Sequence, residues 1–372
     1  MNRLILLSRK LDQGGAERQL VVLAKALKGK GHDVHVVLFY SDGAFDDELV
    51  TAGVYVHFVN KRGRWDVFGF LTRLVRILRK LRPAMIYSFL DVPNILTALL
   101  FPWIGRPRLI WGVRAAGMEL QHYDWLARVV SRFETVLSRV ADLAIANSRA
   151  GENWANDRGF KATRMVVVEN GIDTVLFHPD PKGGQRIRDG WGVKENQRLI
   201  GLVARLDVMK DHRNFLQACA LLAKKRDNLR FVCVGSGSAS YRASLEVIAE
   251  NLGLAGRVIW AGARQDMPII YSALDISCSS SAFGEGFPNA IGEAMSCGVP
   301  CVVTDVGDSA RIVDKLGEIA PPRDAEALSD AMERMLDRLE SDAGIRNLVR
   351  ERIVTEFSVE RMVQRTEQLL FE

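Results

Sequence analysis

The chain has 372 residues, of which 48% are hydrophobic and 26% are charged, and its formal net charge is +5. This composition excludes a disordered or fibrous protein, and the length predicts two domains or one large one, because single cores stop growing at roughly 250–300 residues. The longest near-continuous apolar run, 95–105, is interrupted by Pro102 and is shorter than the roughly 20 residues of a membrane-spanning helix. The N-terminal apolar run is too short for a signal peptide. We therefore expect a cytoplasmic protein.

The cysteine pattern indicates a reducing compartment. All five cysteines lie in the second half of the chain, their number is odd, and no C-x-x-C pair occurs. We expect most of them to be small core residues, with a redox or metal role as the alternative. The six histidines form no metal-spaced cluster with the cysteines, so no metal site is expected.

Positive charge is concentrated in the first half. Residues 1–180 hold 25 Lys and Arg against 18 Asp and Glu, whereas residues 181–372 hold 25 against 27. A basic first half predicts an anionic partner on that side, such as a membrane surface, a phosphorylated ligand or nucleic acid.

Short apolar runs alternate with helical patterns along the chain, which is typical of parallel sheets covered on both faces. In the first half the expected helices include 16–30, 67–81 and 123–140, and the expected strands are 4–8, 34–40, 54–59, 84–89, 108–113 and 143–147. The pattern then restarts with helices at 213–225, 240–252, 289–297 and 325–338 and strands at 198–204, 229–235, 257–260, 275–279 and 299–303.

Two consecutive sets of strand–helix units predict an α/β protein of two Rossmann-like, doubly wound domains that face a central cleft. The expected domains are residues 1–175 and 176–355, followed by a C-terminal helix at 356–372 that returns to the first domain. The Pro- and Gly-rich segment 173–192 is the expected linker. Because such sheets bind ligands at the carboxyl ends of their strands, the functional residues should lie in loops that follow strands.

Three loops after expected strands suit a phosphorylated ligand. Gly15 opens the first helix, where a glycine allows close backbone approach to an anion, with an ordinary turn as the alternative. Arg205 and Lys210 share one short loop, in which a forked donor and a point charge suit a diphosphate; an exposed surface pair is the alternative. Gly235 and Gly237 directly follow a strand and would let a nucleotide lie against the backbone.

The most informative segment is 283–295, FGEGFPNAIGEAM. Pro288 suits the first turn of a helix, and Gly286 with the following N–H groups forms an anion-binding helix start. Glu285 precedes this start and Glu293 lies on the helix, so we expect the carboxylates to accept hydrogen bonds from sugar hydroxyls. Two Glu eight residues apart are otherwise typical of a solvated helix face.

Glu285-x7-Glu293, within EGFPNAIGEAMSCGVP, resembles the E-x7-E signature of family 4 retaining glycosyltransferases, which have the GT-B fold. The resemblance runs through most of the chain, at GGAER (14–18), NGID (170–173), ARLDVMKDH (204–212) and VGSG (234–237). It implies a nucleotide-diphosphate-sugar donor, by default a UDP-sugar, on the second domain and an acceptor on the first. It implies no cofactor.

The roles of the family's residues carry over to the matching positions. Arg205 and Lys210 would bind the diphosphate and stabilise the leaving group without a metal, and the sequence has no D-x-D motif. Glu285 would hold and polarise the transferred sugar, while Glu293 would bind the ribose. The other donor contacts implied are Gly15, Gly235, Gly237, Phe287, Pro288, Asn289 and Ala290. Family members retain the anomeric configuration, and same-face attack would require no protein nucleophile.

The chain departs from the family pattern after the fifth strand. Many relatives carry a His there, whereas this chain reads WGVRAAG (111–117) and Arg114 takes the position. Arg114 would contact a donor phosphate or an acidic acceptor, with a structural salt bridge as the alternative. His122, eight residues further on, is the other candidate for the role of the His.

Segment 61–82 combines eight basic residues with apolar residues at helical spacing. One interpretation is a helix that covers the first sheet with a solvated basic face. The other is an anionic-membrane surface, Lys61–Arg82, assisted by the loop of Trp103, which would bring the acceptor site to lipid-linked saccharides. No nucleic-acid recognition motif occurs, so no nucleic-acid partner is expected.

The sequence therefore predicts a retaining, metal-independent glycosyltransferase, cytoplasmic or peripheral on the inner face of the cell membrane. It would move a hexosyl or N-acetylhexosaminyl group to a glycan acceptor, such as a lipid-linked or surface polysaccharide intermediate. The alternatives are a nucleotide-sugar 2-epimerase of the same fold, which needs no acceptor, and a non-catalytic nucleotide-sugar-binding protein. A nicotinamide dehydrogenase is disfavoured because no G-x-G-x-x-G follows a strand.

Overall fold

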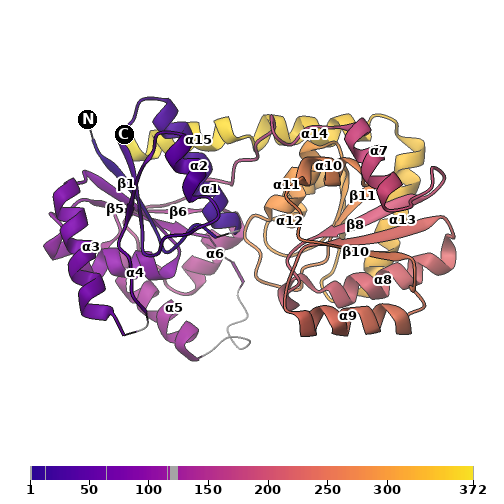
Figure 1. Ribbon diagram of the computed structural model, residues 1–372, viewed down its shortest axis with the longest axis horizontal. Helices are drawn as coiled ribbons and strands as arrows, with labels where there is room; N and C mark the ends of the chain where they lie inside the picture. The colour runs from indigo at the N-terminus through magenta and orange to yellow at the C-terminus, as the bar shows by residue number, and fades with distance from the viewer. Residues whose placement is uncertain (1, 13, 64, 115, 118–124, 372) are drawn as a thin grey trace. The chain divides into compact units, whose positions relative to one another are not determined.

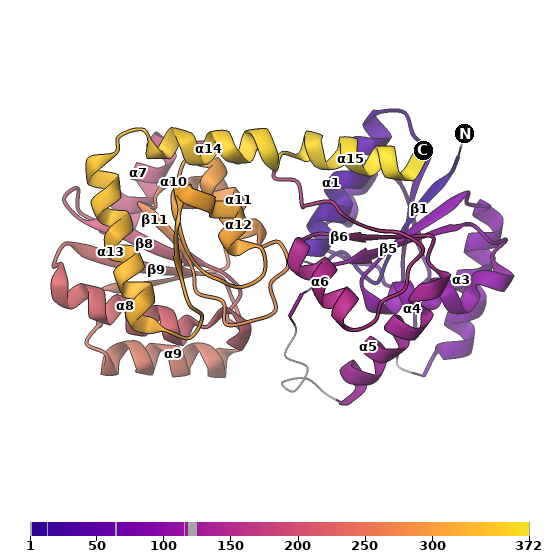
Figure 2. The same cartoon turned by 180° about the vertical axis from the view of Figure 1, so that it is seen from behind.

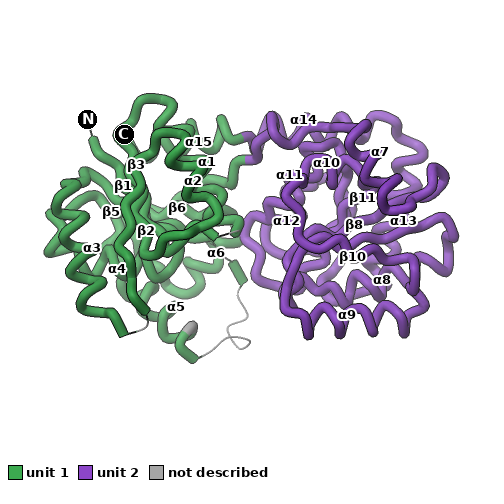
Figure 3. Tube along the Cα trace, in the orientation of Figure 1, with its two compact units in different colours: residues 1–171, 359–372 green, residues 172–358 purple. Residues whose placement is uncertain are grey.

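The computed structural model describes residues 2–12, 14–63, 65–114, 116–117 and 125–371 (Figure 1). The chain forms two compact units, of which unit 1 comprises residues 1–171 and 359–372 and unit 2 comprises residues 172–358 (Figure 3). Each unit is a parallel sheet with helices on both faces, which confirms the prediction of two Rossmann-like α/β domains. Within the described ranges, none of the helices has the length and apolar character needed to span a membrane.

Unit 1 contains a seven-stranded sheet in the order β3-β2-β1-β4-β5-β6-β7. Its strands are β1 (Leu4–Ser8), β2 (Val34–Leu38), β3 (Tyr55–Phe58), β4 (Met85–Phe89), β5 (Arg108–Val113), β6 (Leu143–Ala146) and β7 (Met165–Val167). Its helices are α1 (Gly15–Gly29), α2 (Asp46–Thr51), α3 (Val67–Leu81), α4 (Asp91–Leu100), α5 (Trp125–Leu137), α6 (Arg149–Asp157) and α15 (Val359–Phe371), with short 3-10 turns η1 (Phe101–Trp103) and η3 (Ser138–Val140).

The central strand of unit 1 shows why helices cover both faces of this sheet. β1 reads LILLS and is buried at every position. Leu4 and Leu6 pack into a core with α1 and α15, whereas Ile5 and Leu7 pack into a second core with α3. A continuous apolar run is therefore stable in this strand because alternate side chains enter cores on opposite faces.

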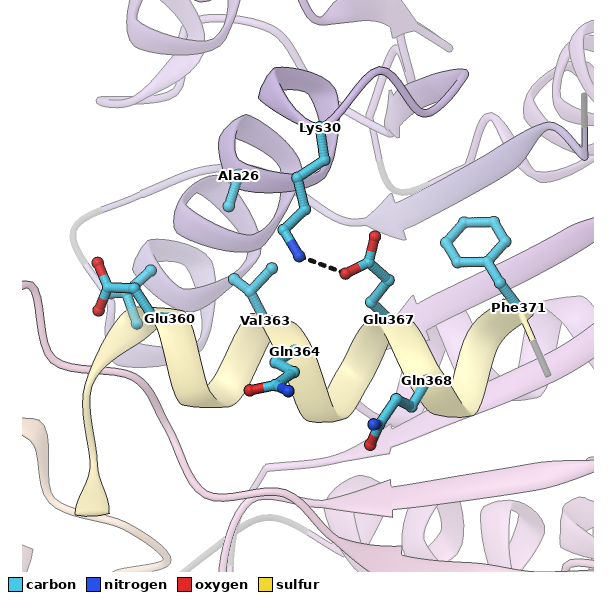
Figure 4. A pocket seen from close by; sticks show the side chains of 9 residues that line it. Ala26, Lys30, Glu360, Val363, Gln364, Glu367, Gln368 and Phe371 are labelled. Carbon is cyan, nitrogen blue, oxygen red and sulfur yellow. Dashed lines mark hydrogen bonds and ion pairs between the residues drawn. The ribbon is translucent and has the colours of Figure 1, made fainter. Parts of the chain in front are cut away.

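The C-terminal helix α15 packs on α1 within unit 1 (Figure 2, Figure 4). Its apolar face enters the core of the unit, and the Phe371 ring stacks on His32 with ring centroids 4.2 Å apart. The Glu367 carboxylate pairs with Lys30 and lies 2.6 Å from Nε2 of His32. These two partners, His32 first, lower the pKa of Glu367. Apolar burial and this ion cluster together hold α15 on the first sheet.

The chain passes between the units at two adjacent points. In unit 1, the Gln19 side chain donates to the Gly171 carbonyl at 2.8 Å and accepts from the Gly171 amide at 2.9 Å. A Cβ on Gly171 would lie 2.7 Å from Cα of Val359, so only glycine fits there. In unit 2, the Ile172 amide donates to the Phe357 carbonyl at 2.8 Å. The passage at Gly171 and Ile172 is therefore held by α1 in unit 1 and by Phe357 in unit 2. Phe357 lies just before the second passage, at 358–359.

Unit 2 contains a six-stranded sheet in the order β10-β9-β8-β11-β12-β13. Its strands are β8 (Arg198–Val203), β9 (Leu229–Val234), β10 (Val258–Gly262), β11 (Ile276–Ser279), β12 (Cys301–Thr304) and β13 (Glu318–Ala320). Its helices are α7 (Pro181–Gly190), α8 (His212–Lys225), α9 (Ala239–Asn251), α10 (Met267–Ser272), α11 (Asn289–Ser296), α12 (Ser309–Val313), α13 (Ala325–Ser341) and α14 (Ile345–Glu356), with η4 (Val208–Lys210) and η5 (Asp314–Leu316).

The core of unit 2 again has two layers. α8, α9 and α13 cover one face of the sheet, and α10, α11, α12 and α14 cover the other. All five cysteines are unpaired and buried in these layers, which confirms that they are core residues: Cys219, Cys233, Cys278, Cys297 and Cys301. Burial raises the pKa of each of these thiols, so they are poor nucleophiles.

The prediction of a linker at 173–192 is wrong, because the whole segment belongs to unit 2. The passage between units lies at 171–172, and residues 181–190 form α7. The two glycines that suggested a flexible segment instead allow close helix packing. A Cβ on Gly184 would lie 2.4 Å from the carbonyl oxygen of Ser272, and one on Gly183 would lie 2.6 Å from Ile269. Pro181 occupies the first turn, where its missing N–H has no cost.

His212, at the start of α8, is a fully buried titratable group. Neither ring nitrogen has a hydrogen-bond partner within the described part of the chain. Burial first, and the charge of Lys210 second, lower the pKa of His212 to about 4. The imidazole is therefore neutral in the folded protein under conditions in which the unfolded chain binds a proton.

This difference predicts an acid-dependent loss of stability. Since the pKa is lower in the folded state, the destabilisation is absent above about pH 6.5 and grows as the pH falls toward 4. When the pH is lowered from about 7.5 to about 5, the free energy of unfolding should fall by about 2 kcal/mol less in the His212→Leu variant than in the wild type. Urea titrations at the two pH values measure this difference.

The exposed His178 in the same unit gives the matched control, because His178→Leu removes an imidazole that is already in solvent. That variant should follow the wild-type pH dependence. Equal pH slopes for His212→Leu and the wild type would show that the buried ring does not control the acid sensitivity.

Candidate functional site

The loops that follow β8 and β11 form the candidate site in unit 2. β8 pairs with β11 in parallel, so the carboxyl ends of both strands lie at the same edge of the sheet. This is also where the strand order reverses, since the chain runs from β8 outward to β10 and then returns to β11. Ligands of doubly wound sheets bind at such switch points. The sheet order therefore brings segments 204–211 and 280–288 together.

A buried ion pair joins these two loops. The Nζ atom of Lys210 contacts Oε1 of Glu285, and the two side chains are 21% and 7% exposed. The Ser281 hydroxyl donates to the same carboxylate oxygen. Lys210 thus lies beside the first Glu of the E-x7-E segment, although the two residues are 75 positions apart in the chain.

Backbone hydrogen bonds fix the loops on each other. The Ala282 amide donates to the Met209 carbonyl at 2.8 Å, and the Ser280 hydroxyl donates to the Lys210 carbonyl at 2.8 Å. The backbone of Gly307 packs against that of Glu285, since a Cβ on Gly307 would lie 2.3 Å from the Glu285 carbonyl oxygen. The position of Glu285 is therefore set by packing on two sides as well as by its ion pair.

Arg205 is placed differently from Lys210. Its Nη2 atom lies 3.3 Å from Oδ2 of Asp207, and its side chain is 68% exposed. Asp207 also accepts from the Met209 amide at 3.0 Å and so begins the 3-10 turn η4. The sequence grouped Arg205 with Lys210 as one cationic pair, but the structure brings Lys210 to the acidic loop and leaves Arg205 at the surface.

Glu293 lies on α11, and its Oε2 atom accepts a hydrogen bond from the Tyr271 hydroxyl at 2.9 Å. Burial first, and the Glu293 charge second, raise the pKa of Tyr271, so the phenol stays protonated and donates. α11 begins at Asn289, with Pro288 as the preceding residue and no side chain capping the helix start. Phe287 and Pro288 are buried, whereas Asn289 and Ala290 are half-buried.

Gly235 and Gly237 pack against the loop of Arg205. A Cβ on Gly235 would lie 2.0 Å from the Ala204 carbonyl oxygen, and one on Gly237 would lie 2.4 Å from that of Leu206. Gly235 also has a φ of 144°, a conformation that other residues rarely adopt. These glycines are required by the contact between two loops, a structural reason that the sequence did not reveal.

The predicted residues of unit 1 lie at the corresponding edge of the first sheet. Gly15 is the first residue of α1, which follows β1 and has no side-chain cap. Arg114 directly follows β5, and its guanidinium lies 4.5 Å from the centroid of the Phe89 ring. It donates to the Tyr87 hydroxyl at 2.6 Å and to Oδ1 of Asn170 at 3.2 Å. Both acceptors are neutral, so these hydrogen bonds leave the charge of Arg114 uncompensated. His122 lies outside the described residues.

Segment 61–82 is mostly the helix α3. Its inward side is apolar, and its outward side carries the exposed Phe68, Arg76 and Lys80. The predicted Lys61–Arg82 surface is not uniformly cationic, because Arg73 turns inward to pair with Asp66 and to donate to the Val59 carbonyl. Contact of this surface with a membrane stays a prediction.

Sequence reasoning missed the residues that contact the predicted site residues and help to place them. Tyr271 holds Glu293, Ser281 holds Glu285, and Asp207 holds Arg205. The four-residue spacing of Ser281 and Glu285 was a weak local signal, whereas Tyr271 comes from another helix and left none. The assembled site offers a half-buried cation, two oriented carboxylates and a helix start without a side-chain cap at one sheet edge.

Two family models match the chain. Residues 13–176 match the model described as Glycosyltransferase Family 4, and residues 197–338 match the model described as Glycosyl transferases group 1. Together these matches cover most of the chain. The boundary between them lies close to the passage from unit 1 to unit 2.

Individual proteins agree with this match. EpsF of Bacillus subtilis is 22% identical over 79% of this chain and 77% of its own length. The D-inositol 3-phosphate glycosyltransferase of Corynebacterium urealyticum is 31% identical over 208 residues, which span about half (49%) of that enzyme. The solved structure of Anabaena HepE with UDP-glucose has a TM-score of 0.88 at 24% identity and covers 100% of this chain and 99% of its own. The chain therefore belongs to the glycosyltransferases of the GT-B fold, with a family 4 domain in its first half and a group 1 domain in its second.

Proposed function

We propose that the protein transfers a sugar from a nucleotide-diphosphate-sugar to a glycan acceptor with retention of the anomeric configuration. The observation that supports this proposal most directly is the buried ion pair of Lys210 and Glu285 where the loops after β8 and β11 meet. A fixed cation suits a departing diphosphate, and an adjacent carboxylate suits the carbohydrate it leaves. HepE has been described with UDP-glucose, which supports a UDP-sugar as the donor class.

In the proposed reaction, the bond between the anomeric carbon and the diphosphate oxygen breaks, and its electron pair leaves with the diphosphate. The acceptor hydroxyl oxygen forms the new bond on the same face of the sugar, and its proton passes to the leaving phosphate oxygen. Lys210 stabilises the negative charge that develops. Arg205 contributes a second cation, because its exposed side chain is free to reorient toward a bound ligand. This arrangement would operate without a metal ion.

The carboxylates have separate roles in the proposal. Glu285 accepts hydrogen bonds from the transferred sugar and balances the charge of Lys210 until the donor binds. Glu293 accepts hydrogen bonds from the ribose hydroxyls. The Tyr271 hydroxyl, which also donates to this carboxylate, fixes its orientation. The N–H groups at the start of α11 favour the anionic part of the donor.

Arg114 is the proposed anion contact in unit 1. Its guanidinium is fixed by Tyr87, Phe89 and Asn170, none of which neutralises it. A preorganised cation of this kind suits a phosphate or carboxylate of the bound substrates. We further propose that the acceptor is a lipid-linked or surface-polysaccharide intermediate, in agreement with the basic character of the first half of the chain.

A donor screen tests the proposal first. The full chain is mixed in turn with UDP-glucose, UDP-galactose, UDP-N-acetylglucosamine and GDP-mannose, and its melting temperature is measured. A ligand that binds only the folded protein raises this temperature. NMR of the enzyme with the donor alone then identifies a 2-epimerase, because epimerisation at C2 needs no acceptor. A donor that binds but gives no product with any of a panel of glycan acceptors would favour a binding protein.

Replacing Lys210 tests the leaving-group role. Lys210→Met keeps the aliphatic stem and removes the charge, so kcat for transfer or for slow donor hydrolysis should fall about 10²–10³-fold, the effect of losing one transition-state donor. Release of the nucleoside diphosphate from the donor found in the screen measures the rate.

The control for this variant is Lys224→Met, which removes an exposed ammonium from the end of α8. It should keep the wild-type rate. If Lys210→Met turned over donor as fast as Lys224→Met does, the leaving-group role would be wrong.

Replacing Glu293 tests the ribose contact. Glu293→Gln keeps an acceptor for Tyr271 but removes the charge, so the KM for the donor should rise about tenfold, the value of one charge-assisted hydrogen bond, while kcat changes less. Glu250→Gln, at an exposed position on α9, is the matched control. An unchanged donor KM in Glu293→Gln would refute the assignment.

A further inference from the structure

A basic groove lies on the outer surface of unit 1, along α5 and at the end of α6. It has a volume of about 650 Å³ and is lined by Arg128, Ser131, Arg132, Thr135, Val136 and Arg158. Among the described residues, the lining thus consists of three guanidinium groups, two hydroxyl groups and one apolar side chain, and includes no carboxylate. Three arginines with neighbouring hydroxyl donors form a site that suits a phosphate group.

Arg158 and Glu134 form the buried side of the groove. The Arg158 guanidinium lies 3.6 Å from the centroid of the Trp154 ring, donates to the Ser131 hydroxyl, and has Nη2 3.6 Å from Oε2 of Glu134. Glu134 is buried and also accepts from Asn94 at 2.9 Å. Burial raises the pKa of Glu134 and lowers that of Arg158. Even with Glu134 ionised, the exposed Arg128 and Arg132 have no carboxylate partner among the residues that the structure describes.

The same helix presents large apolar side chains to solvent. Trp125 is 69% exposed, and Phe133 and Val136 are each 56% exposed. Arg128 and Arg132 are four residues apart and therefore lie on one side of α5, where Trp125 is three residues before Arg128 and Val136 is four residues after Arg132. A helix with aromatic and basic side chains side by side on its exposed surface is typical of segments that lie in the interface of an anionic bilayer.

We propose that this groove binds the phosphate groups of anionic membrane lipids and holds unit 1 on a bilayer, with Trp125 and Phe133 inserted among the lipid chains. A soluble phosphate compound would use the arginines but would leave the exposed rings without a partner, whereas a lipid satisfies both. The site lies on α5 and uses none of the Lys61–Arg82 residues of α3. It is also independent of the proposed transfer reaction, because lipid binding requires neither donor nor acceptor.

Vesicle flotation of the full chain tests the proposal. Vesicles of phosphatidylglycerol mixed with phosphatidylcholine are compared with vesicles of phosphatidylcholine alone, in buffer without nucleotide-sugar. The wild type should bind to the anionic vesicles and dissociate from them at high salt, because salt screens the attraction between the arginines and the lipid phosphates. Arg128→Ala/Arg132→Ala should lower the partition coefficient about 30-fold, because each basic side chain near the surface contributes about a factor of five. Phe133→Ser should lower it as well.

The matched control is Lys182→Ala/Arg186→Ala, which removes two exposed cations with the same four-residue spacing from α7 of unit 2. It should bind within about twofold of the wild type, since the lost charges are not at the site. The positions changed in both double variants are exposed, so their melting temperatures should match the wild type and exclude unfolding as the cause.

Three results would overturn the proposal. The first is wild-type binding with no preference for anionic vesicles. The second is an equal loss in the α5 and α7 double variants, which would indicate net charge rather than a groove. The third is binding of free inorganic pyrophosphate, measured by calorimetry and abolished by Arg128→Ala/Arg132→Ala, without vesicle binding, which would identify a soluble phosphate compound as the ligand.

Discussion

The pairing of β8 with β11 is the constraint on which the candidate site depends. Parallel strands place their carboxyl ends at one edge of the sheet, so the loops after these neighbours must meet. The meeting puts Lys210 against Glu285, a contact with both groups largely removed from water. An isolated buried charge would be strongly unfavourable, and each of these residues makes the burial of the other tolerable. The site is therefore held in a charged, preorganised state before any ligand arrives.

Close backbone packing gives the site its rigidity. Gly235 and Gly237 allow one loop to lie on the backbone of the Arg205 loop, and Gly307 does the same for Glu285. Each of these contacts leaves no room for a side chain at the glycine. The backbones therefore pack directly on each other, and this packing would be lost if the loops separated. Arg205 differs, because its side chain is 68% exposed and pairs with Asp207 of its own loop. The site thus combines closely packed groups with one exposed cation.

The asymmetry of charge along the chain becomes an asymmetry between two units. Unit 2 holds the acidic pair and its cation at one sheet edge, whereas unit 1 carries excess arginine on its outer helices. Some of those arginines are structural, as Arg73 and Arg158 show by their carboxylate partners. Arg128 and Arg132 differ because they line an open groove beside exposed aromatic rings. Charge counts alone do not separate these two kinds of arginine.

The sequence by itself determined the fold class, most strand positions and the loops that form the candidate site, because apolar periodicity and strand-end motifs are local. It missed β7 and β13, since three-residue edge strands give too short a pattern, and it mistook α7 for a linker, since the packing of Gly183 and Gly184 is not local. The tertiary structure alone decided that Lys210 reaches Glu285 while Arg205 does not, and that Tyr271 orients Glu293. Those contacts depend on strand order and helix packing, which bring together residues far apart in the chain and which no local pattern encodes.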